Sequence, residues 1–68
     1  MTDSKSSYPA LEEGAAAAAD LAEALQTTGV RLPSLRGDFP AGERAHVQLG
    51  GASAVVVRRL AAWIRERA

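Results

Sequence analysis

The chain has 68 residues, of which 47% are hydrophobic, with no cysteine and one histidine. A domain of this size buries only about 60% of the surface that its unfolded chain exposes, so its core is thin. A chain without cysteine has no disulfide, and one histidine without thiols excludes a structural zinc site. Self-association therefore becomes a candidate source of stability.

The formal net charge of zero hides an asymmetry along the chain. Up to Thr28, one lysine opposes five carboxylates and the net charge is −4; from Gly29 onward, seven arginines oppose three carboxylates and the net charge is +4. Acidic residues favour helix N-termini and basic residues favour C-termini, and opposite halves also attract each other within one fold. A basic binding surface is the alternative explanation.

The sequence contains no membrane-spanning or secretory pattern. No apolar run approaches the roughly 20 residues that a membrane span needs, and the first residues lack the apolar core of a signal peptide. The absence of cysteine gives no sign of an oxidising compartment. We therefore expect a cytoplasmic protein that does not bind membranes.

The chain divides into a tail and one domain. Residues 1–8 are expected to form a disordered tail, and residues 9–68 a single domain. A helix is predicted from about Pro9 to Thr28, because proline suits the first helical turn.

The apolar face of this first helix is shallow. Leu11, Ala18 and Leu25 recur every seven residues on a face that is mostly alanine, so whatever packs on it must approach closely. Gly29 is the predicted stop: a left-handed glycine would return Val30 against Leu25, as in a Schellman cap.

Two short strands are predicted over residues 30–32 and 45–49, where apolar and polar residues alternate. The segment between them is crowded with turn-forming residues, namely Gly37, Asp38, Pro40 and Gly42. Pro33 cannot donate to a ladder, so it places the first strand at an edge or bends it. A hairpin with a long loop results, and helices must cover it or a second copy must extend it, because an isolated hairpin is marginal in water.

A second helix is predicted from a cap at Ser53 nearly to Ala68. At about 100° per residue, one side of it is apolar and wide, formed by Val56, Val57, Leu60, Ala61, Trp63 and Ile64. The fold class is therefore α+β: helix, two-stranded antiparallel hairpin, helix (αββα) in one small domain, with both helices closing one face of the hairpin.

The wide apolar face predicts a surface for a protein partner or a homodimer. We expect Val57, Leu60 and Ile64 to pack in the core, whereas the shallow first helix cannot cover the margins of the face. Phe39, alone in the loop, either folds back on the core or anchors a partner, and Trp63 is expected half-buried under the stem of Arg59. The predicted partner-binding residues are Trp63, Arg59, Val56, Val55 and Phe39.

The alternative function is accessory nucleic-acid binding by Arg58, Arg65 and Arg67, with an affinity that falls as salt rises. More than twenty residues separate the two helices, unlike a helix-turn-helix reader. The glycine pair of "LGGAS" is a weak anion-loop pattern that a tight strand-to-helix turn explains equally well.

The residue inventory argues against an enzyme. The chain has no cysteine nucleophile, no lysine after Lys5 and no serine with an evident base, and its core is too small to enclose a substrate cleft. His46 lacks convergent ligands and is expected to be a surface residue. We expect no metal, no cofactor and no small-molecule substrate.

The stretches "GVRLPSL" and "VQLGGASAVVVRRLAAWI" resemble small uncharacterised proteins of actinobacteria, over about Leu21 to Arg67. The shared pattern is a helix, a G-V-x-L-P-S-L strand entry, a V-x-L-G strand exit and a second helix. The resemblance implies the fold and carries no activity.

Overall fold

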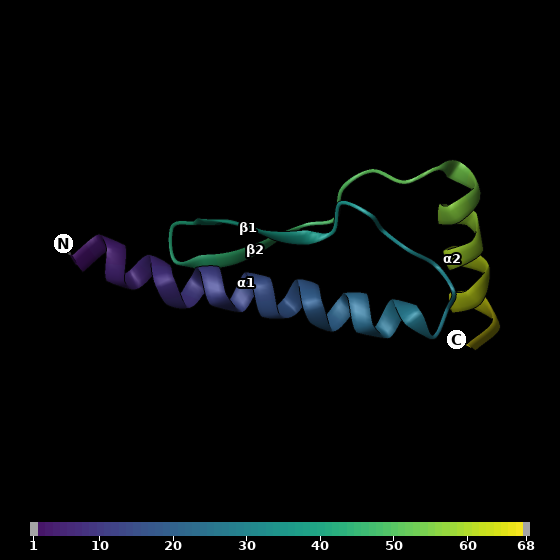
Figure 1. Ribbon diagram of the computed structural model, residues 1–68, viewed down its shortest axis with the longest axis horizontal. Helices are drawn as coiled ribbons and strands as arrows, with labels where there is room; N and C mark the ends of the chain where they lie inside the picture. The colour runs from purple at the N-terminus through teal and green to yellow at the C-terminus, as the bar shows by residue number, and fades with distance from the viewer. Residues whose placement is uncertain (1, 68) are drawn as a thin grey trace.

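The computed structural model describes residues 2–67 and has the αββα order expected from the sequence (Figure 1). Its elements are helix α1 (Thr2–Gln26), strands β1 (Arg36–Ala41) and β2 (Arg44–Gln48), and helix α2 (Ala54–Arg67). The two strands form one antiparallel sheet. The fold is therefore a small α+β domain.

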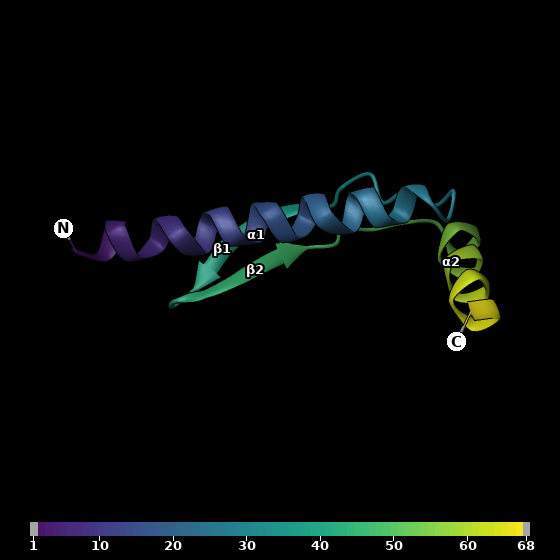
Figure 2. The same cartoon turned by 90° about the horizontal axis from the view of Figure 1, so that it is seen from below.

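Helix α1 begins at Thr2, so the expected beginning near Pro9 is wrong; the proline lies inside the helix. Its missing N–H leaves the carbonyl four residues earlier without its helical donor. The first turns of α1 project beyond the hairpin (Figures 1 and 2). The predicted tail includes Met1, which lies outside the described residues, and its disorder stays a prediction.

Small residues bring α1 against the hairpin at backbone distance. The buried positions that line this side of α1 include Ala10, Gly14 and Ala18. A Cβ added at Gly14 would lie 2.5 Å from the backbone oxygen of His46, and one added at Gly37 would lie 2.8 Å from a backbone nitrogen of α1. The expectation of a close approach on a shallow face is confirmed.

The first strand lies later in the chain than the alternation of residues 30–32 predicted. β1 occupies the segment expected to be a long loop, and the connection to β2 is the two-residue turn Gly42–Glu43. Gly42 has φ +63°, the conformation that glycine adopts without steric cost and that a tight hairpin turn requires. The prediction of 30–32 as a strand and of a long loop is therefore wrong.

A bulge explains how β1 accommodates a proline. Asp38 pairs with His46 and Ala41 pairs with Arg44, so Phe39 and Pro40 together stand opposite one residue of β2. The extra residue interrupts the ladder where proline has no N–H to donate.

Gly29 ends the turn that follows α1, with φ +74°. The N–H of Val30 donates to the Thr28 hydroxyl (2.9 Å), which in turn donates to the carbonyl of Leu25 (2.6 Å). This hydroxyl bridge joins the two groups that a Schellman cap would pair directly. Leu25 and Val30 are both buried, as expected for the apolar pair that accompanies such a cap.

Pro33 lies in the turn that follows, which is closed by a hydrogen bond from the N–H of Leu35 to the carbonyl of Leu32.

Helix α2 begins after the cap that the sequence predicted. The N–H of Val56 donates to Ser53 Oγ (3.2 Å), and the N–H of Val57 donates to the Ser53 carbonyl (3.0 Å). Among residues 2–67, no Cα atom of α2 lies within 8 Å of one in α1, β1 or β2. The hairpin is therefore covered by α1 alone, and the expectation that both helices close one of its faces is wrong.

The molecule is elongated, with extents of 47 × 21 × 16 Å. Helix α2 lies at one end, beside the C-terminal end of α1, and the hairpin turn lies toward the other (Figures 1 and 2). Four hydrophobic residues are buried among those whose side chains are described, namely Ala10, Ala18, Leu25 and Val30. None of them belongs to α2.

Candidate docking surface

The apolar side of α2, which we call the α2 stripe, consists of Val56, Val57, Leu60, Ala61, Trp63 and Ile64. Two of these residues, Val57 and Ile64, expose 51% and 52% of their surface. The other four are partly covered. Val57, Leu60 and Ile64 were expected to pack in the core, and this is wrong because no residue of α2 is buried. Val57 and Ile64 form an open edge of the stripe.

The guanidinium of Arg67, one helical turn after Trp63, lies over the indole ring of Trp63. The guanidinium carbon of Arg67 lies 4.0 Å from the ring centroid, and Arg67 Nη1 also donates to the Trp63 carbonyl at 3.2 Å. Trp63 is half-buried, as expected. Arg59 and Arg67 are each four residues from Trp63 along the helix. Arg59 was expected to cover the indole, but Arg67 is the residue stacked on it.

The three arginines of the nucleic-acid alternative do not share one face. Arg58 and Arg65 are seven residues apart and project from nearly the same side of α2, whereas Arg67 is directed to Trp63 on another side. Val55, which is 64% exposed, projects from the side of α2 away from Ile64. It is thus exposed as expected, but outside the α2 stripe.

Phe39 is exposed over 82% of its surface, so it does not fold back on the core. The bulge holds it outward, and its N–H donates to its neighbour Asp38 Oδ1 at 2.7 Å. A shallow groove of about 480 Å³ runs beside it between α1 and β1. We call it the Phe39 groove; its lining residues are Leu11, Ala15, Arg36, Gly37, Asp38 and Phe39.

The structure does not bring Phe39 together with the other predicted partner residues. Phe39 belongs to β1, which no Cα of α2 approaches within 8 Å. The predicted partner-binding residues therefore do not form one surface, because Phe39 lies apart from those of α2. The Phe39 groove itself was missed, because its residues come from α1 and from a segment predicted as loop.

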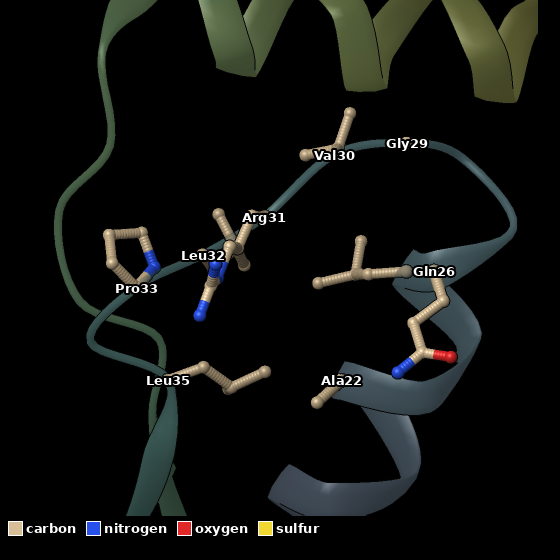
Figure 3. A pocket seen from close by; sticks show the side chains of 9 residues that line it. Ala22, Gln26, Gly29, Val30, Arg31, Leu32, Pro33 and Leu35 are labelled. Atoms are coloured by element: carbon tan, nitrogen blue, oxygen red, sulfur yellow. The ribbon is translucent and has the colours of Figure 1, made fainter.

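A second hollow of about 470 Å³ lies between the end of α1 and the connection to β1 (Figure 3). Ala22 and Leu35 face each other across it, and Val30 points away toward α2. Arg31 is its one charged lining residue. This arrangement lacks the few converging polar groups that orient a small molecule.

Opposite charges lie on the two helices without meeting. Four carboxylates of α1 are exposed, namely Glu12, Glu13, Asp20 and Glu23. Within the part of the chain whose side chains are described, the ion pair that forms is between Arg67 and Glu66, 3.5 Å apart on α2 itself. Among the described side chains, the carboxylates of α1 therefore form no ion pair with the arginines of α2.

None of the helices within residues 2–67 has a stretch of the length and hydropathy that a membrane crossing requires. Among the side chains that the structure describes, no group of three histidine, aspartate or glutamate residues is arranged to hold a metal ion. His46 is exposed on β2.

Comparison with protein-family models, with curated proteins and with solved structures found no match. The function is therefore inferred from the geometry, exposure and charge of this chain. The resemblance to actinobacterial proteins stays a prediction.

Proposed function

We propose that the protein is a non-enzymatic interaction module that acts by docking the α2 stripe onto another protein surface. The observation that carries the proposal is the open edge of the stripe, where Val57 and Ile64 are half exposed on a helix that has no buried residue. Monomeric soluble proteins seldom leave contiguous apolar surface uncovered unless it binds something.

Docking would bury the apolar edge and leave charges around it. Trp63 and Arg67 flank one side of the edge, while Arg58 and Arg65 flank the other. An apolar centre with an arginine-rich rim is the arrangement that gives affinity through burial and orientation through charge. The rim favours an acidic partner surface.

Photo-crosslinking in the cells that produce the protein tests this proposal. A photoreactive amino acid placed at Ile64 should yield a discrete protein adduct, because that position would lie inside the interface. The matched control is Leu49, which is 54% exposed and lies outside both helices. If Ile64 gives no adduct, or the same diffuse products as Leu49, the docking proposal is wrong.

A further inference from the structure

We propose that the partner is a second copy of this chain, in an antiparallel pair in which the α2 stripe of each copy lies in the Phe39 groove of the other. This inference rests on the proposed docking function and names its partner. Three independent properties of the chain support it: the area that it leaves exposed, the positions of its two apolar surfaces, and its charges.

The chain exposes more surface than a compact monomer of its mass, and the excess is large enough for one side of a dimer interface. The chain exposes 5418 Å², whereas a compact monomer of 7.1 kDa would expose about 4,100 Å². Its Cα radius of gyration is 14.5 Å, against about 11 Å for a compact domain of 68 residues. The excess of about 1,300 Å² exceeds the roughly 800 Å² that each partner buries in a standard interface.

The two apolar surfaces lie toward opposite ends of the long axis. Helix α2 is at one end, and β1 with the Phe39 groove lies along the other half (Figures 1 and 2). Two copies side by side and antiparallel therefore bring each α2 to the other's groove. Both contacts form at once and are related by a two-fold axis, so the assembly closes as a dimer and does not extend into a filament.

The charges around the two surfaces are complementary. Asp38 lines the Phe39 groove, and Glu12 is three residues from Ala15 and so borders it on α1. The groove's one cation, Arg36, donates through Nε and Nη2 to Gln48 Oε1 across the hairpin. Asp38 and Glu12 against Arg36 leave this surface with a net charge of −1, which the arginines around the α2 stripe would meet on the second copy.

Sedimentation of the purified full chain over a range of concentrations measures the dimer, with substitutions on each surface. Ile64→Glu and Phe39→Glu should each weaken dimerisation by at least tenfold, about 1.4 kcal/mol, because each places a charge in the interface. Leu49→Glu is the matched control, since Leu49 is 54% exposed and Ile64 is 52% exposed, and it should change the dimer constant by less than about twofold. Circular dichroism of each variant establishes that it is folded.

A charge exchange tests the antiparallel arrangement. Arg58→Glu with Arg65→Glu makes the margin of the α2 stripe acidic, and Glu12→Arg with Asp38→Asn makes the Phe39 groove basic. Each double variant alone should be monomeric, because like charges then face each other at both contacts. An equimolar mixture should restore a dimer, because every contact regains opposite charges.

The outcomes separate this inference from the docking function on which it rests. A strictly monomeric chain, or a mixture of charge variants that stays monomeric, overturns the antiparallel pair. If the Ile64 adduct in cells has twice the mass of the chain, both proposals are supported. If the adduct contains a different protein and the purified chain is monomeric, docking holds and self-pairing is wrong.

Discussion

Arg67 holds its guanidinium 4.0 Å from the ring centroid of Trp63, one turn earlier on the same helix. The contact fixes the indole at the margin of the α2 stripe and keeps a cation beside it. Arg67→Ala should therefore increase quenching of Trp63 fluorescence by acrylamide, because the ring loses its cover. Trp63 is the only tryptophan, so the signal is unambiguous. Arg65→Ala, on another side of α2, should leave the quenching unchanged; an equal increase in both variants would contradict the contact.

Gly14 sets the distance between α1 and the hairpin. A Cβ there would lie 2.5 Å from the backbone oxygen of His46, so Gly14→Ala must push the strand away from the helix. We expect a loss of about 1–3 kcal/mol in the free energy of unfolding, measured by urea denaturation. Gly51→Ala is the control, since a Cβ added at Gly51 would have no neighbour within 4 Å. Equal stability of the two variants would show that the close approach is absent.

Ser53 caps the N-terminus of α2, because its Oγ accepts a hydrogen bond from the N–H of Val56. No Cα atom of α2 lies within 8 Å of α1 or the hairpin and no residue of α2 is buried, so the stability of α2 depends strongly on its own end groups. Ser53→Ala should cost about 1 kcal/mol and reduce the helical signal in circular dichroism, whereas Ser53→Asp should retain it. If alanine and aspartate gave the same helical signal, the cap would have no role.

The segment before Pro9 is expected to exchange its amide hydrogens fast. The proline removes one helical hydrogen bond, and the turns before it project beyond the hairpin (Figure 1). Amides of residues 2–8 should exchange much faster than those of residues 14–25, which pack on the strands. Equal protection of both segments would contradict the prediction of a tail over residues 1–8.

Local chemistry explains which parts of the fold could be predicted. Gly29 and Ser53 were identified correctly as the stop of the first helix and the cap of the second, because each acts through its own backbone or its nearest neighbours. β1 was missed because Gly37, Asp38 and Pro40 are typical of turns. They form a strand here since Gly37 lets α1 approach and a bulge accommodates the proline.

The sequence predicted which residues of α2 form an apolar surface, but it did not predict where α2 lies relative to the hairpin. The width of the apolar side of α2 indicated more hydrophobic surface than the fold covers, and Ile64 and Val57 are indeed half exposed. Periodicity could not show that α2 stands away from the hairpin, since that depends on the length and path of the connections. Nor could spacing choose between Arg59 and Arg67 as the partner of Trp63, because both are four residues away.

The most direct test of the account is an isotope-filtered nuclear Overhauser measurement between the Ile64 methyl groups and the Phe39 ring. The chain has one isoleucine and one phenylalanine, and α2 and β1 have no Cα atoms within 8 Å of each other. In a mixture of differently labelled copies, the account predicts a cross-peak between these two side chains that arises only between molecules. A dimer without that cross-peak, or a chain that stays monomeric, would contradict it.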